Sequence, residues 1–174
     1  HHPQARAHRV DFQLEGGGMR TFLTNMRPRN FEDIIAAISL YRPGPMDSIP
    51  RYIEGKQHPE SVRYETPLLK PILSVTYGCM VYQEQVMQIV RDLAGYSYGR
   101  SDLVRRAMAK KKKDVMAKER EYFVYGSEQE GVAGAVRNGV PAEVAEKIFD
   151  EMTSFASYAF NKSHAAAYGV VAVR

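Results

Sequence analysis

The sequence YGRSDLVRRAMAKKKKDVMAKER, from Tyr98 to Arg120, carries the strongest structural and chemical signal in the chain. Its apolar residues recur at the spacing of one helical face, which predicts an amphipathic helix. They are Leu103, Val104, Ala107 and Met108. Ser101 is expected to cap the start of this helix, and Asp102 in its first turn suits the helix dipole. One face of the helix is therefore expected to pack onto a core while the other stays exposed.

The polar face of this helix is strongly basic, because nine residues of the stretch are basic and only three are acidic. On a continuous helix, Arg106, Lys110 and Lys113 would stand in one row at i, i+4 and i+7, with Arg105 beside them. Each close like-charge pair costs about 0.2–0.5 kcal/mol, which a bound phosphate or polyanion would offset. Anion binding is therefore favoured over a merely solvated face. The sequence leaves open whether the helix breaks near Lys111.

The composition is that of an ordinary globular protein. Hydrophobic residues make up 44% of the 174 residues and charged residues 25%, which suits one domain or two small ones. The net charge of +4 is mild, so its concentration in residues 100–120 is the better sign of a nucleic-acid or phosphate partner. The single cysteine, Cys79, excludes an internal disulfide and favours a reducing compartment. No apolar run approaches the ~20 residues of a membrane span and no secretory signal is visible, so a cytoplasmic protein is expected.

Helix signals dominate the remainder of the chain. Capping residues and apolar periodicity predict helices over Met19–Met26, Asn30–Tyr41, Ser48–Lys56, Val81–Ala94, Pro141–Tyr158 and Ala165–Val173. A helical turn is expected at Leu68–Leu73 and an extended segment at Val75–Met80. The sequence thus predicts a mainly α fold of about seven to nine helices, with little or no strand at the N-terminal edge.

The domain organisation is expected to be simple. Residues 1–18 are interpreted as a tail or linker, in part derived from a tag, and residues 19–174 as one helical unit. Because the chain begins without Met and ends directly after a helical run, we expect it to be a piece of a longer protein.

Capping residues in the sequence predict where several helices begin and end. Asn30 is expected to cap the helix that follows it, with Asp33 where a capping box usually has Glu or Gln. The buried face of that helix is expected to contain Phe31, Ile34, Ile35 and Ile38. Gly95 is placed to end the helix before it, and the short turn that remains predicts a helical hairpin with the basic helix. Glu84 lies in the first turn of that preceding helix, where a carboxylate suits the dipole.

A second position that favours a negative partner lies near the C-terminal end. Lys162 would stand near the N-terminus of the last predicted helix, which is unfavourable unless an anion is present. Asn161 or Ser163 would cap this helix, and His164, although more often a structural residue than a catalyst, lies beside them. Arg42 precedes a rigid Pro-Gly-Pro turn and is either an anion contact or a surface residue at a helix end.

Four segments occur in a fixed order along the chain. They are YRPGPM at 41–46, VYQEQVM at 81–87, LVRRAM at 103–108 with its lysine run, and FNKSHAAAY at 160–168. Together with FQLE at 12–15, they closely resemble the alpha subunit of bacterial DNA polymerase III, the C-family replicative polymerase. The resemblance covers residues 11–174 and implies the fingers domain, which in the family is largely helical and closes over the incoming deoxynucleoside triphosphate (dNTP).

The resemblance also implies a nucleotide site. It assigns Arg105 and Arg106 to the phosphates of the dNTP, and Lys110 extends this basic row. The other residues placed near the nucleotide are Asn161, Lys162, Ser163, His164 and Arg42. The residues placed in contact with DNA or nucleotide are Lys111, Lys112, Lys113, Tyr82, Gln83 and Glu84. The family usually has Gly where this chain has Ala109. Since Ala favours a continuous helix, the lysines of this chain would then face a different side of the helix from the family's lysines.

By the same resemblance, the intact protein is a DNA-directed DNA polymerase and this chain holds no catalytic residue. The family's catalytic carboxylates lie in the palm and hold two Mg²⁺ ions, so the chain is expected to be inactive alone and to bind no metal. Expected partners are template-primer DNA, dNTP, the palm and remaining domains, and, through other regions, the sliding clamp and further replicase subunits, but no membrane. The alternative is a non-catalytic helical nucleic-acid-binding or assembly module that uses the basic patch at 100–120.

Overall fold

The computed structural model describes residues 17–41 and 48–157. Within these residues the chain forms α-helices and short 3₁₀ turns, and no strand; Ser127 and Val132 pair in an isolated bridge. The α-helices are α3 (Gly17–Met26), α4 (Phe31–Leu40), α5 (Ile49–Gln57), α6 (Lys70–Leu73), α7 (Gln83–Ala94), α8 (Tyr98–Ala109), α9 (Lys113–Tyr125) and α10 (Ala142–Ala156). The 3₁₀ turns are η2 (Pro59–Ser61), η3 (Pro67–Leu69), η4 (Ser74–Thr76) and η5 (Val136–Asn138). The predicted mainly α class is confirmed.

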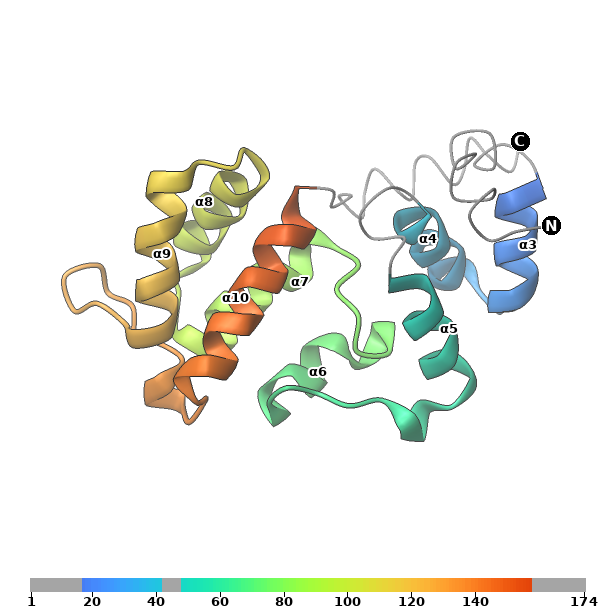
Figure 1. The fold of residues 1–174 in the computed structure, drawn as a ribbon, viewed down its shortest axis with the longest axis horizontal. Helices are drawn as coiled ribbons and strands as arrows, with labels where there is room; N and C mark the ends of the chain where they lie inside the picture. Colours follow the sequence, from blue (N-terminus) through green and yellow to red (C-terminus); the bar gives the residue numbers. More distant parts are fainter. Residues whose placement is uncertain (1–16, 42–47, 158–174) are drawn as a thin grey trace.

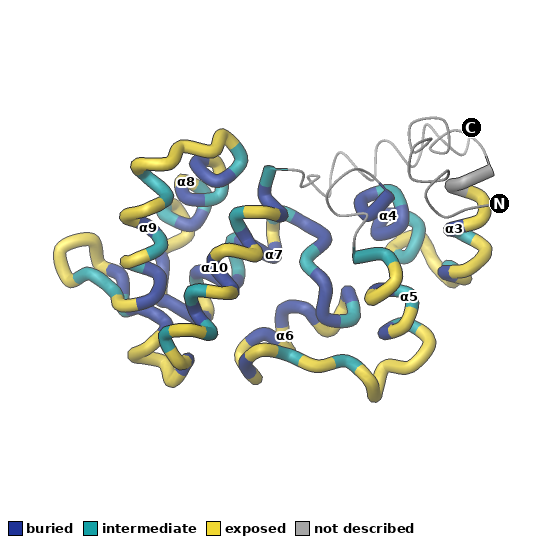
Figure 2. The backbone as a smooth tube through the Cα atoms, viewed as in Figure 1, coloured by how far each residue is buried: buried dark blue, intermediate teal, exposed yellow. Residues whose placement is uncertain are grey.

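The described helices bury their apolar faces in two hydrophobic clusters. In Figure 1, α3, α4 and α5 gather at one end and α7, α8, α9 and α10 at the other, joined by a long segment that contains α6. The first cluster includes Phe22, Met26, Leu40, Tyr52 and Val81. The second is larger and includes Val86, Ile89, Leu93, Met108, Phe123, Ile148, Phe149 and Met152. Figure 2 shows the buried positions of α7, α8, α9 and α10 facing one another. None of the described helices is long and apolar enough to cross a membrane.

The start of α4 follows the sequence prediction, with one difference in its cap. Asn30 accepts a hydrogen bond from the N–H of Asp33 at 2.9 Å, as expected. The Asp33 carboxylate instead accepts from the N–H of Arg29 at 2.8 Å and pairs with Lys56 of α5 at 3.0 Å. Partial burial acts to raise the pKa of Asp33, but these partners outweigh it and hold the pKa below its ordinary value. The prediction for Phe31 is wrong, because its side chain is 49% exposed while Ile35 is buried.

The start of α8 lies one turn earlier than the sequence predicted. The helix begins at Tyr98, and Ser97 caps it by accepting a hydrogen bond from the N–H of Arg100 at 3.1 Å. Ser101 is not the cap, since it is buried and donates to the carbonyl oxygen of Tyr98 at 2.6 Å. α8 packs against α7 after the short turn at Gly95, which ends α7 with a positive φ of 78°. The predicted packing of these two neighbouring helices is confirmed.

The segment before α7 is not extended as predicted. Residues 74–76 form η4, and Tyr77 follows in the left-handed region with a φ of 56°. The buried side chain of Gln85 then fixes the start of α7. Its carbonyl oxygen accepts from the N–H groups of Val81 at 2.8 Å and Tyr82 at 3.0 Å, and its amide donates to Thr76 at 2.8 Å. These bonds satisfy backbone donors that a buried helix start would otherwise leave unpaired.

A buried ionic network holds α8 against α9. The guanidinium of Arg100 contacts Glu119 of α9 at 2.5 Å and Glu130 of the following loop at 2.7 Å. The hydroxyl of Tyr96 donates to Glu119 at 2.8 Å, and the rings of Tyr96 and Tyr122 flank the guanidinium. Only 5% of the Glu119 side chain is exposed, so its charge has little access to water and depends on these partners.

The loop after α9 brings two backbone segments into direct contact at Gly126. The φ of Gly126 is 84°, and a Cβ atom there would lie 2.3 Å from the carbonyl oxygen of Ala133. Two hydrogen bonds close the same loop onto the helices: Gly134 donates to Ala94 at 2.9 Å and Ala135 donates to Phe123 at 2.7 Å. Because the obstacle is backbone, it has little freedom to move aside.

We therefore expect Gly126→Ala to lower the free energy of unfolding by at least about 3 kcal/mol, since backbone strain and a steric clash add. Gly131→Ala is the matched control, because Gly131 also has a positive φ, 72°, but nothing lies within 4 Å of the added Cβ. The control should cost only about 1–2 kcal/mol for the left-handed backbone. Urea denaturation followed by circular dichroism measures both, and equal losses would contradict the close approach.

Candidate nucleic-acid and phosphate interface

The chain reverses direction between α8 and α9. Lys110 ends α8, and Lys111 takes a left-handed conformation with a φ of 56°. The N–H of Lys111 donates to Met108 and that of Lys112 to Ala107, each at 3.1 Å, which is the hydrogen-bond pattern of a Schellman motif. The helix therefore breaks at Lys111, although Ala109 favours continuation.

This reversal makes the predicted single row of charges wrong. Lys113 is the first residue of α9, so it does not share a helical face with Arg106. The side chains of Lys110, Lys111, Lys112 and Lys113 are instead gathered around one turn, and all four residues are exposed. Within residues 17–41 and 48–157, no carboxylate lies within 4 Å of any of these four ammonium groups. We call Arg105, Arg106 and Lys110–Lys113 the basic junction.

The two arginines of the basic junction share one acidic partner. Asp102 places one carboxylate oxygen 2.5 Å from Nη2 of Arg105 and the other 2.7 Å from Nη2 of Arg106. The Arg105 side chain is 20% exposed and that of Arg106 is 60% exposed. The hydrogen bond from Arg105 is the main cause that holds the pKa of Asp102 below its ordinary value, so the carboxylate stays ionised at neutral pH.

The start of α7 lies beside these arginines. Gln83, the first residue of α7, accepts a hydrogen bond from Nη1 of Arg105 at 3.2 Å. The structure thus brings Gln83 to Arg105, two residues that the sequence placed near the same ligand. Glu84 is exposed in the first turn of α7, as predicted. Tyr82 is only 6% exposed and packs in the first hydrophobic cluster, and burial raises the pKa of its hydroxyl.

The N-terminus of α9 adds to the positive field of the basic junction. Lys112 and Lys113 stand at the first positions of α9, where the helix dipole is itself positive. Asp114 in the first turn offsets part of this charge. The oxygens of a phosphate group placed there would accept hydrogen bonds from the lysine ammonium groups and from backbone N–H groups, so this helix start favours an anion.

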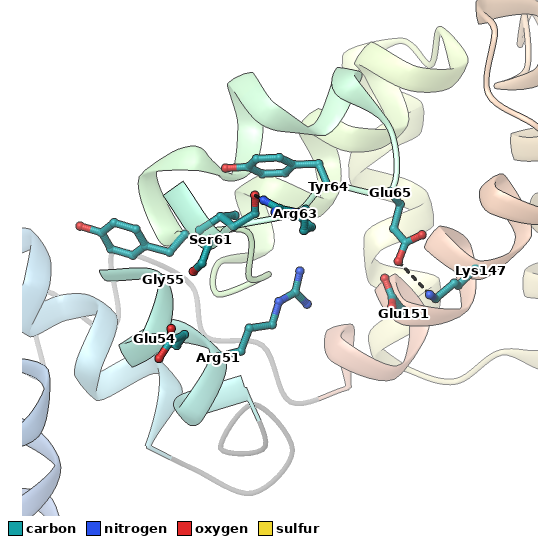
Figure 3. A pocket seen from close by; sticks show the side chains of 11 residues that line it. Arg51, Glu54, Gly55, Ser61, Arg63, Tyr64, Glu65, Lys147 and Glu151 are labelled. Carbon is teal, nitrogen blue, oxygen red and sulfur yellow. Dashed lines mark hydrogen bonds and ion pairs between the residues drawn. The ribbon is translucent and has the colours of Figure 1, made fainter. Parts of the chain in front are cut away.

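A second candidate region is a cavity of about 540 Å³ between α5, the 61–65 loop and α10 (Figure 3). No pattern in the sequence predicted this cavity. Its charged lining consists of Arg51, Arg63, Lys147, Glu54, Glu65 and Glu151. Three basic and three acidic groups balance, and Lys147 is already paired with Glu65 at 2.8 Å. Burial raises the pKa of Glu151, but the balanced charges favour neither an anion nor a cation, so the basic junction is the better site for phosphate.

Sequence comparison with known proteins shows the family to which the chain belongs. A sequence model of the bacterial DNA polymerase III alpha subunit finger domain matches residues 10–131. The chain belongs to this family. It is 52% identical over 160 residues to the DNA polymerase III subunit alpha of Chlamydia trachomatis, 50% over 161 residues to that of Halalkalibacterium halodurans and 52% over 165 residues to that of Thermus aquaticus. Each match covers 92% of this chain and 12–14% of the relative.

The finger-domain match contains the whole basic junction and the start of α7, whereas α10 follows the matched range. The remaining predicted site residues lie outside the described residues and stay predictions. They are Arg42, Asn161, Lys162, Ser163 and His164. The predicted helix at 165–173 and the segment at 10–15 lie outside them as well.

The left-handed conformation of Lys111 leads to a stability prediction for this finger domain. Lys111→Gly should raise the free energy of unfolding by about 1 kcal/mol, because glycine adopts a positive φ without strain. Lys118→Gly removes the same charge at an exposed position inside α9 and should instead lower stability by about 0.5–1 kcal/mol, the cost of glycine within a helix. Chemical denaturation of both variants measures the difference. Destabilisation by Lys111→Gly as large as that by Lys118→Gly would argue against the helix break.

Proposed function

We propose that this chain works as part of the fingers of a DNA-directed DNA polymerase in replication. In this proposal the basic junction, with the start of α7, binds the triphosphate of the incoming dNTP and the backbone of the template DNA. The observation that carries the proposal is the arrangement of Arg105 and Arg106 beside Gln83, next to four exposed lysines. Membership of the finger-domain family and the names of the relatives support it.

The chemistry of the basic junction suits a polyphosphate. Each guanidinium offers a planar fork of N–H donors that matches two phosphate oxygens, whereas each lysine adds a compact charge without a fixed direction. A triphosphate carries several negative charges over a short chain, so it can contact both arginines and a neighbouring ammonium group together. We infer that Arg105 and Arg106 fix the direction of the phosphates and that Lys110–Lys113 contribute attraction to nucleotide or DNA.

In this role the finger domain would assist the reaction without performing it. In-line phosphoryl transfer gains from positioning and from positive charge near the oxygens that become more negative in the transition state. Within the described residues, no three His, Cys, Asp or Glu side chains lie close enough together to hold a metal ion. The described part of the chain therefore does not offer a site that fits the Mg²⁺ ions of the family. We propose that Mg²⁺ and the catalytic carboxylates belong to palm residues outside this chain.

The partners follow from the same proposal. They are template-primer DNA, dNTP and the palm and other domains of the polymerase, with the sliding clamp and further replicase subunits engaged through other regions. The proposed location is the cytoplasm, where a bacterial chromosome is replicated.

A second function, a nucleic-acid-binding module without a nucleotide site, is favoured by one observation alone: the lysines of the basic junction have no acidic partner within 4 Å among the described residues. Such a module would bind DNA with an affinity that falls steeply with salt, and it would not respond to free nucleotide. Titration with DNA and with dNTP at two salt concentrations separates the two functions.

The proposed function predicts a specific kinetic defect in the full-length polymerase. Changing Arg105 and Arg106 together to Ala should raise KM for dNTP and lower kcat, with a loss of at least about 100-fold in kcat/KM, because binding and transition-state contacts are both removed. Steady-state primer extension over a range of dNTP concentrations measures this change.

Arg137→Ala is the control for removal of a surface arginine. Arg137 lies in η5, and its neighbour Asn138 donates to Leu93 near the C-terminal end of α7, whereas the nucleotide site is placed at the N-terminal end. This control should leave KM and kcat within about twofold, as expected for a surface substitution. Equal kinetics in the double variant and the control would rule out the assignment of the two arginines.

A further inference from the structure

The carboxylate of Asp102 occupies the position between the two arginines of the basic junction. We propose that Asp102 is an internal counter-anion, which holds Arg105 and Arg106 in place until a polyphosphate displaces it. This inference rests on the proposed function, because it assigns a positioning residue to the same phosphate site.

The geometry supports exchange between the carboxylate and a phosphate. The two oxygens of Asp102 are divided between the arginines, at 2.5 Å from Arg105 and 2.7 Å from Arg106. Arg105 also donates through Nη1 to Gln83, so both of its terminal nitrogens are engaged. A phosphate that takes both nitrogens of this guanidinium must therefore replace at least one of these partners.

The charges favour a polyphosphate as the replacement. One carboxylate facing two guanidinium groups leaves one positive charge uncompensated. A monovalent anion that displaced Asp102 would leave the same net charge at the two arginines, so it would gain little binding free energy. A di- or triphosphate brings two or more charges and can give each arginine its own oxygen pair. The structure thus selects for ligands with several adjacent negative charges.

The exposure of the Asp102 carboxylate explains why a ligand can displace it from the two arginines. The Asp102 side chain is 32% exposed, and ion pairs with this access to water contribute little to stability. Arg100, five residues before Arg105 on α8, provides the contrast, because its partner Glu119 is only 5% exposed. The Arg100 pair cannot be opened without leaving a charge buried, whereas the Asp102 carboxylate can turn into solvent when it is released.

A purely structural role for Asp102 makes the opposite prediction. Ion pairs at i, i+3 and i, i+4 stabilise a helix, so their loss would weaken α8 and the site that it carries. Loss of helix stability cannot tighten the binding of an anion. A gain in affinity on removal of the Asp102 charge is therefore a readout that separates a counter-anion from a helix-stabilising residue.

The test is isothermal titration of the full chain with inorganic tripolyphosphate at fixed salt, with circular dichroism to confirm equal helix content. Asp102→Asn should tighten binding by about three- to tenfold, since the arginines no longer have to exchange a charged partner. Asp92→Asn is the control, because it removes the same charge from an exposed residue near the C-terminal end of α7, whereas the arginines lie beside the N-terminal end of that helix. It should change affinity by less than about twofold.

The outcomes separate this inference from the proposed function. If Asp102→Asn weakens binding, or if both Asn variants tighten it equally, Asp102 is not a counter-anion to the arginines. The Arg105→Ala/Arg106→Ala chain tests the site itself and should lose binding. If binding survives in that double variant, or is absent from the unmodified chain, the phosphate site is not the basic junction and both proposals fail.

Discussion

The buried pair between Arg100 and Glu119 is the interaction on which the rest of the site depends. Opening it would leave a charge with almost no access to water, so the pair fixes α8 against α9 far more firmly than a surface ion pair could. Glu130 pairs with the second terminal nitrogen of Arg100 and so ties the loop after α9 to the same point, and the Tyr96 hydroxyl donates to Glu119. The basic junction lies at the opposite end of α8, and its position is set by this anchored start.

The reversal at Lys111 determines how the positive charges are presented. A continuous helix would spread the lysines along and around one axis, whereas the Schellman turn gathers them where α8 ends and α9 begins. The C-terminus of α8 tolerates Arg106 and Lys110, because its dipole end is negative. The N-terminus of α9 offers no such compensation to Lys112 and Lys113. The turn is therefore the part of the surface where a negative ligand would relieve the most repulsion.

The sequence predicted the mainly α class and most helices, because their periodicity is long and their caps at Asn30 and Gly95 are local signals. It placed the start of α8 one turn late, because the apolar stripe begins only at Leu103, whereas the true cap, Ser97, lies six residues before that stripe. It also left the break at Lys111 open. Local propensity favours helix there, and the reversal is instead imposed by packing of α9 on α8 and α10. The Gln83 contact and the shared use of Asp102 depend on side-chain positions that no periodic pattern specifies.

The two arginine clusters of α8 show why residue type alone does not identify a binding site. Arg100 and Arg105 lie five residues apart, and each pairs with a carboxylate at 2.5 Å. They differ in what surrounds the pair: Arg100 is flanked by two tyrosine rings and bonded to two glutamates, whereas Arg105 shares a solvent-accessible carboxylate with a second arginine. A ligand can replace a partner only where the released group finds water. Burial, which the fold alone determines, therefore makes one cluster a fixed support and leaves the other available for exchange.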